Sequence, residues 1–117
     1  MIHERKKIAR IVEELTLFFF ALGADRIQSG IKEDGNGVVI DFQANYQPEN
    51  EYKLEQMEKD LNCPKNDAMK DVYWELAGSG EPEDTEQLLL VGMMIDQVQI
   101  RKEEGEVYLR LYKTQQE

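Results

Sequence analysis

The sequence predicts an α+β fold, a two-layer sandwich in which helices cover one face of a four-stranded antiparallel or mixed sheet. Two observations support this class. First, segments with apolar residues at helical spacing precede segments in which every second residue is apolar. Second, the alternating segments come as two pairs, and each pair is joined by a glycine-containing turn. Helices gathered on one face of such a sheet bury every apolar stripe, so we expect residues 1–117 to form a single domain.

The first half of the chain predicts a long helix followed by a hairpin. Residues 4–22 place apolar side chains on one helical face, and Gly23 follows at a position where helices commonly end. Residues 26–44 alternate apolar and polar side chains on either side of a turn that contains Gly35 and Gly37. We therefore expect two antiparallel strands directly after the first helix.

The second half predicts further helices and a closing hairpin. The expected elements are helices within 51–77, an acidic loop at 78–84, a helix at 85–95 and a hairpin at 97–113. The last helix follows a capping-box pattern formed by Asp84 and Gln87. The two hairpins give the topology a twofold rhythm, although the sequence contains no internal repeat.

Composition and charge restrict the classes of function. The chain has 24 acidic and 14 basic residues, a formal charge of −10, and 12 of those acids against 4 bases lie in residues 49–86. This acidity argues against a nucleic-acid or membrane partner, and the longest apolar run, residues 17–22, is far shorter than the about 20 residues that span a bilayer. With one cysteine, one histidine and no secretory signal pattern, the sequence predicts a cytoplasmic protein without a disulfide or a catalytic triad.

Two segments resemble the histidine-kinase-like ATPases, specifically their small anti-sigma-factor serine-kinase branch. The segment from Leu88 to Tyr112 resembles the end of that fold, in which a helix ends in an aspartate, here Asp96, before a strand, a glycine-containing turn and the last strand. The Val-Glu-Glu-Leu sequence at 12–15, in a long helix followed by a hairpin, is similar to the family's opening helix. The resemblance implies an ATPase-like fold in which a nucleotide would lie between the opening helix and the sheet.

The resemblance also implies that the metal and adenine positions are degenerate. Glu14 corresponds to the family's water-polarising glutamate, but the asparagine expected four residues later, which helps to hold Mg²⁺, is Phe18. A phenyl ring cannot coordinate a cation that requires oxygen ligands. The family's adenine-reading aspartate and its following glycine fall at Ala44 and Tyr46, which supply neither the carboxylate nor the permissive backbone.

The remaining nucleotide positions are equally unsuitable. A shifted register offers Asp41 or Asn45 in place of the adenine-reading aspartate, but neither is followed two residues later by glycine. The family's phosphate-binding Gly-X-Gly turn falls at Thr85-Glu86-Gln87, where Glu86 would repel a phosphate. The resemblance, taken with these departures, implies no cofactor and no bound metal.

Three functions remain open. The first is a non-catalytic regulatory or protein-interaction domain with a degenerate ATPase-like fold, whose partner, or second copy in a homodimer, docks on Leu17 and Phe20 if they stay exposed. The second is a divergent ATP-binding anti-sigma factor or serine protein kinase, with ATP and Mg²⁺ as cofactors and Glu14 as the catalytic base. The third is an unrelated α+β domain that binds a small apolar ligand among its aromatic residues.

Overall fold

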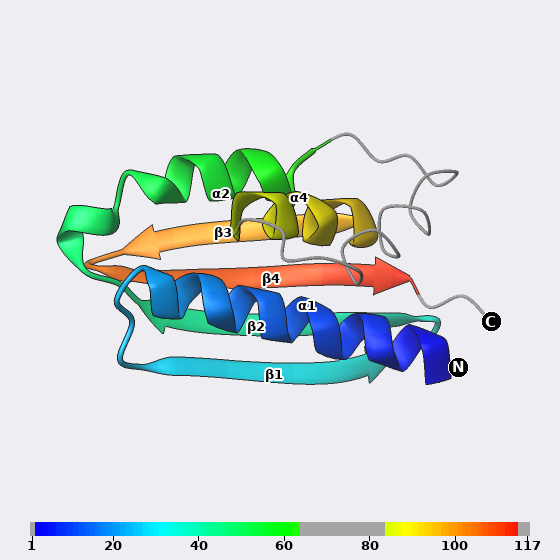
Figure 1. Cartoon of the computed structure of the whole chain (residues 1–117). Helices are drawn as coiled ribbons and strands as arrows, with labels where there is room; N and C mark the ends of the chain where they lie inside the picture. Colours follow the sequence, from blue (N-terminus) through cyan, green and yellow to red (C-terminus); the bar gives the residue numbers. More distant parts are fainter. Residues whose placement is uncertain (1, 64–83, 115–117) are drawn as a thin grey trace.

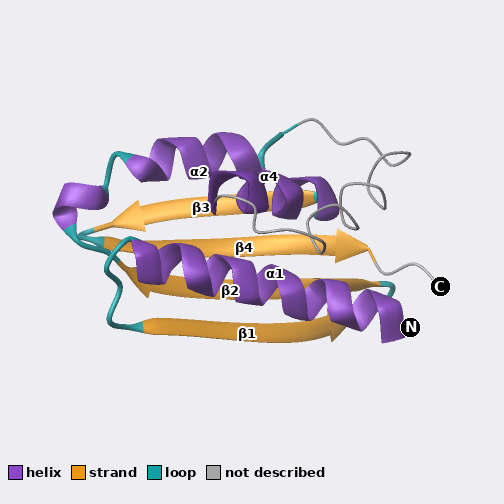
Figure 2. Cartoon of the chain, in the orientation of Figure 1, coloured by secondary structure: helices purple, strands orange, loops and turns teal. Residues whose placement is uncertain are grey.

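The computed structural model describes residues 2–63 and 84–114, and within them it forms the predicted α+β sandwich (Figure 1). The element bounds are α1 (Ile2–Ala21), β1 (Ile27–Asp34), β2 (Gly37–Asn45), a 3₁₀ turn (Pro48–Asn50), α2 (Lys53–Leu61), α4 (Asp84–Met94), β3 (Gln97–Glu103) and β4 (Glu106–Thr114). Figure 2 shows the helices on one side of the sheet.

The two predicted hairpins join into one four-stranded antiparallel sheet with the order β1-β2-β4-β3. The central contact is the pairing of β2 with β4, in which Ile40 lies opposite Leu111 and Phe42 lies opposite Leu109. Successive side chains of a strand point to opposite faces, so every second residue of both strands is buried under the helices. The other face of the sheet carries no helix among the described residues.

The helices supply the side of the core that faces the sheet. Residues of α1 at helical spacing are fully or almost fully buried, and Phe19 stacks on Phe42 of β2 with 5.4 Å between ring centroids. The short helix α2 and the helix α4 add their own apolar stripes. The buried apolar side chains of these two helices are Leu54, Met57, Leu61, Leu88, Leu90, Val91 and Met94.

Close approach between α2 and α4 depends on a glycine. A Cβ atom added at Gly92 would overlap the backbone carbonyl oxygen of Asp60 and would press on the Cα atom of Leu61. Because both neighbours are backbone atoms, they cannot move away by a change of rotamer. Gly92 therefore sets the distance at which α4 packs on α2.

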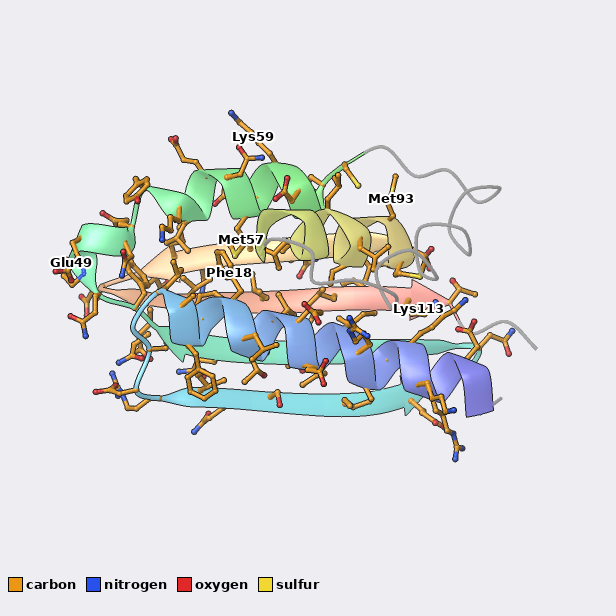
Figure 3. The ribbon with its side chains drawn as sticks, viewed as in Figure 1. Phe18, Glu49, Met57, Lys59, Met93 and Lys113 are labelled. Carbon is orange, nitrogen blue, oxygen red and sulfur yellow. The ribbon has the colours of Figure 1, made fainter. Side chains whose placement is uncertain are left out.

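One buried polar cluster interrupts this apolar core. Lys113 lies two residues after Leu111 on the inward side of β4, and its ammonium is 3.1 Å from a carboxylate oxygen of Glu4 in α1 (Figure 3). The other carboxylate oxygen of Glu4 is 3.6 Å from the ammonium of Lys7. All three side chains are buried, so these ion pairs link the start of α1 to the end of β4.

The predicted element bounds agree closely with the structure. The helix expected at 4–22 spans 2–21, the hairpins expected at 26–44 and 97–113 span 27–45 and 97–114, and the helix expected at 85–95 spans 84–94. Within the segment 51–77 the structure describes α2 at 53–61. Residues 64–77 of that segment and 78–83 of the expected acidic loop lie outside the described residues.

Phe19 and Phe20 are neighbours in the chain with opposite environments, since Phe19 is fully buried and Phe20 is exposed. We expect Phe19→Ala to lower the free energy of unfolding by about 3–5 kcal/mol, because it opens a cavity against Phe42. Phe20→Ala should change it by less than about 0.5 kcal/mol. Urea denaturation of both variants measures the difference, and equal losses would contradict the assigned orientation of α1.

Gly92→Ala tests the packing of α4 on α2. The added methyl group has no space beside the Asp60 carbonyl, so we expect a loss of about 1–3 kcal/mol in the free energy of unfolding. Gly30→Ala is the matched control, because a Cβ at Gly30 meets no atom within 4 Å. A Gly92→Ala variant as stable as the Gly30→Ala variant would show that the helices do not approach this closely.

Candidate functional site

The predicted partner-binding residues of α1 are exposed. Leu17 and Phe20 are 53% and 59% exposed, whereas the adjacent Phe18 and Phe19 are buried. The difference follows from helical geometry: Leu17 and Phe20 lie on the side of α1 opposite the residues that face the sheet. The sequence analysis proposed a docking surface here only if Leu17 and Phe20 stay exposed, and both are exposed.

The edge strand β1 also exposes an apolar side chain. Ile31 pairs with the inward-facing Ile40, so its side chain lies on the helix side of the sheet, yet it is 54% exposed. In Figure 1, α1 lies mainly over β2 and comes over β1 only at its own start, near the end of that strand, so the middle of β1 is less covered. We call Leu17 and Phe20 of α1 and Ile27 and Ile31 of β1, taken together, the α1–β1 shelf. An ion pair between Arg5 and Glu33, with 3.8 Å between nitrogen and oxygen, joins the two elements beyond it.

The metal and adenine positions inferred from the family resemblance lie mainly in the core. Phe18, Ala44 and Tyr46 are all buried members of the hydrophobic core. Glu14 is also buried, and its carboxylate accepts a hydrogen bond of 2.9 Å from the Nε atom of Arg10. The carboxylate is thus held by a cation on its own helix.

The hydroxyl of Tyr46 is tied to Glu51. It donates a hydrogen bond of 2.8 Å to a carboxylate oxygen of Glu51. This bond, together with burial and the negative charge of Glu51, raises the pKa of Tyr46 above its ordinary value of 10.0. Tyr46 therefore anchors the start of the segment that leads from β2 to α2.

The phosphate positions are only partly described. Thr85 and Gln87 lie in the first turn of α4, but their side chains fall outside the described part of the chain. Asp96, which carries part of the resemblance, lies two residues after the end of α4 and directly before β3, and it has a structural role at the sheet. Its carboxylate accepts a hydrogen bond of 2.7 Å from the backbone N–H of Thr114, and its own N–H donates to the carbonyl of Tyr112.

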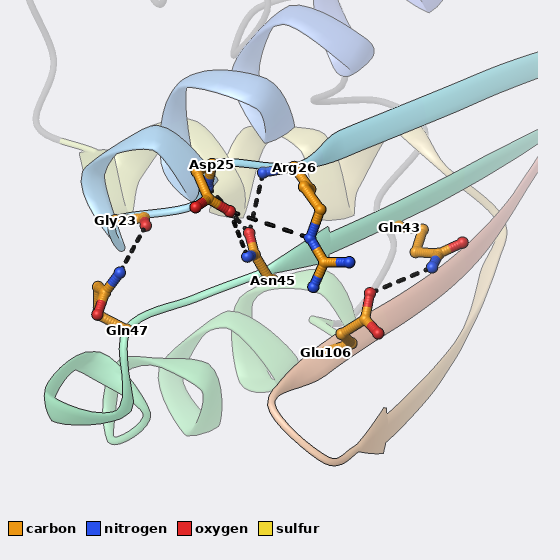
Figure 4. A network of polar contacts seen from close by, with 7 residues as sticks. All are labelled: Gly23, Asp25, Arg26, Gln43, Asn45, Gln47 and Glu106. Atoms are coloured by element: carbon orange, nitrogen blue, oxygen red, sulfur yellow. Dashed lines mark hydrogen bonds and ion pairs between the residues drawn. The ribbon is translucent and has the colours of Figure 1, made fainter.

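The two alternative adenine positions serve other contacts. Asp41 lies on the open face of the sheet, away from the helices, and accepts hydrogen bonds of 2.6 and 3.4 Å from the guanidinium of Arg110. Asn45 holds the connection between α1 and β1 (Figure 4). Its carbonyl oxygen accepts from the backbone N–H groups of Asp25 and Arg26 at 3.0 and 3.1 Å, and its amide nitrogen donates to the Asp25 carboxylate. Two residues further along the chain, the side-chain amide of Gln47 donates a hydrogen bond to the carbonyl of Gly23.

Sequence reasoning missed a hollow of about 610 Å³ on the open face of the sheet. The pair of Asp41 and Arg110 lies near its middle, and the hydrogen bond and charge of Asp41 raise the pKa of the guanidinium. The guanidinium of Arg101 lies 4.3 Å from the ring centroid of Tyr108. Strand alternation could have identified these residues, because they occupy the polar positions between buried ones. Both guanidinium groups have an acidic partner, since Arg110 pairs with Asp41 and Nε of Arg101 lies 3.5 Å from a carboxylate oxygen of Glu103.

Two absences apply to the described part of the chain. Nowhere in it do three or more histidine, cysteine, aspartate or glutamate side chains gather so as to hold a metal ion. None of its helices has the length and apolar character needed to cross a membrane.

The fold and the exposed surface define a two-layer α+β protein with a one-sided helical layer. Comparisons with models of protein families, with curated proteins and with solved structures found no match. The resemblance to histidine-kinase-like ATPases therefore stays a prediction from sequence.

The raised pKa of Tyr46 predicts a pH dependence of stability. The native state holds the phenolic proton more tightly than the unfolded chain, so this contribution is complete below about pH 10 and is lost as the pH rises through the native pKa. We expect the free energy of unfolding to fall less steeply in Tyr46→Phe than in the wild type above that pH. The exposed Tyr52 gives the control variant Tyr52→Phe, and urea denaturation at alkaline pH measures all three slopes. Parallel slopes for wild type and Tyr46→Phe would contradict this assignment.

Proposed function

We propose that this chain is a non-catalytic regulatory or protein-interaction domain that docks a protein partner on the α1–β1 shelf. The observation that supports the proposal is the exposure of Leu17 and Phe20 on α1 and of Ile31 on the edge strand β1. Large apolar side chains grouped at the surface commonly mark association sites. Burial of a leucine or phenylalanine side chain stabilises a complex by about 1.5–3 kcal/mol relative to its exposed state.

The edge of β1 offers a second means of attachment. Strand order leaves one side of β1 without a partner strand among the described residues, so its backbone N–H and C=O groups are available to an added strand. A partner segment could pair with this edge and place apolar side chains against Phe20 and Ile31. Backbone pairing would then supply affinity, while the shelf would supply selectivity.

Charge affects which partners are encountered. Residues 49–86 carry 12 acids and 4 bases, a net charge of −8, whereas residues 1–32 carry 4 acids and 6 bases. A partner with a basic surface would be attracted to the acidic region, and an acidic partner would be repelled. The mechanism we propose is reversible docking by mass action, without a chemical step.

Site-specific cross-linking in cells tests the proposal. A photoreactive benzoylphenylalanine at position 31 should form a discrete adduct, because Ile31 lies in the shelf. The adduct should disappear in the double variant Leu17→Asp and Phe20→Asp, since charged side chains would face the partner's apolar surface. Leu89→Asp is the matched control, because Leu89 is an exposed leucine on a different helix, and it should leave the adduct unchanged.

The mass of the adduct distinguishes a second copy of this chain from another protein. Absence of any adduct at position 31, or an adduct that persists in the double variant, would contradict the proposal. Calorimetry with ATP and Mg²⁺ tests the divergent-kinase alternative: tight binding that is lost in Glu14→Ala would replace the non-catalytic function with nucleotide chemistry.

A further inference from the structure

A pocket of about 390 Å³ lies between α1, α2 and α4, apart from the α1–β1 shelf. Its apolar wall includes Phe18 and Leu22 of α1, Met57 of α2 and Leu88 of α4. Figure 3 shows Phe18 and Met57 between the two helices that carry them. Pockets that bind small molecules commonly measure about 300–1,000 Å³ and combine apolar walls with a few polar groups. The size and lining of this pocket fit that description.

The polar group of interest in this pocket is the carboxylate of Asp60. Asp60 lines the pocket, yet only 6% of its surface is exposed. One carboxylate oxygen, Oδ1, accepts a hydrogen bond of 2.9 Å from the side-chain amide of Gln56. The other, Oδ2, is buried and has no hydrogen-bond partner among the described residues. Buried polar atoms in native proteins nearly always have a partner, so this oxygen calls for one.

The surrounding structure holds the carboxylate in place. The backbone of Asp60 is packed against α4 at Gly92, so α2 cannot turn to bring the side chain into water. Gln56 fixes the orientation of the carboxylate through Oδ1 and leaves Oδ2 for another donor. Lys53, which also borders the pocket, places its ammonium over the ring of Tyr52, 5.9 Å from the centroid. No ion pair joins Asp60 to a lysine or arginine within the described residues.

We propose that this pocket binds a small molecule that carries a protonated amine on an apolar body. Oδ2 of Asp60 accepts a hydrogen bond from the ammonium group, and the apolar body lies against Phe18 and Met57. An ammonium is preferred to a neutral donor because a charge-assisted hydrogen bond to a carboxylate is shorter and stronger. A metal ion is disfavoured, because no cluster of further metal-ligating side chains exists in the described residues.

Binding of two matched probes tests the proposal. Phenethylamine supplies an ammonium on an aromatic body, and phenethyl alcohol supplies a neutral hydroxyl on the same body. Both are titrated into the full chain, and the NMR signal of the Met57 methyl group reports occupancy of the pocket. We expect the amine to bind at least about tenfold more tightly than the alcohol, because only the amine satisfies the buried carboxylate with a charge.

Two variants separate the role of Asp60 from that of other acids. Asp60→Asn keeps an oxygen for Gln56 but removes the charge, so it should weaken amine binding about tenfold and leave alcohol binding unchanged. Glu55→Gln is the matched control, because Glu55 borders the same pocket with an exposed carboxylate, and it should leave both affinities unchanged. If Asp60→Asn fails to fold, Gln56→Ala provides a second test, because loss of the positioning bond should weaken the amine alone.

Several results would overturn the proposal: no shift of the Met57 signal with millimolar amine, equal affinity for the two probes, or undiminished amine binding in Asp60→Asn. The Leu17→Asp and Phe20→Asp double variant should bind the amine normally, because neither residue lines this pocket. Failure of the docking proposal and failure of the ligand proposal are therefore distinguishable.

Discussion

The pairing of β2 with β4 is the contact on which the rest of the structure depends. Each hairpin forms between neighbouring segments, but only this pairing joins residues 37–45 to residues 106–114 and makes one sheet. The two strands are buried at the same alternate positions, so together they form the apolar inward face of the sheet. An isolated hairpin is only marginally stable in water. Pairing of β2 with β4 makes one larger apolar face that α1, α2 and α4 can cover.

The helices cover the inward face of the sheet unevenly, and this produces the surfaces that we associate with function. In Figure 1, α1 lies mainly over β2 and reaches β1 only near the end of that strand, so the middle of β1 is left without a helix above it. An apolar residue on the inward side of β1 therefore stays exposed, as Ile31 does, and Leu17 and Phe20 of α1 are exposed as well. Dense packing of α2 on α4 has the opposite effect, because it encloses Asp60, one of whose carboxylate oxygens has no hydrogen-bond partner within residues 2–63 and 84–114.

Much of the fold could be predicted because its elements are locally encoded. Helical spacing located α1, and the glycine-containing turns located both hairpins. In the β3–β4 turn, Glu104 and Gly105 both have positive φ values, as a two-residue hairpin turn requires. The exposure of Leu17 and Phe20 was foreseeable, because apolar residues surround that end of α1 and one helix cannot bury all of them. The exposure of Ile31 was not, because a covered and an uncovered strand show the same alternation.

The sequence by itself determined where the helices, strands and turns lie, and that they combine into an α+β sandwich, because helical and strand periodicity are properties of a few adjacent residues. Tertiary structure alone decided the order β1-β2-β4-β3, the burial of Lys113 with Glu4, and the enclosure of Asp60. These outcomes depend on contacts between residues far apart in the chain. The local sequence around an acidic or basic residue is the same whether its side chain lies in water or is buried under another helix.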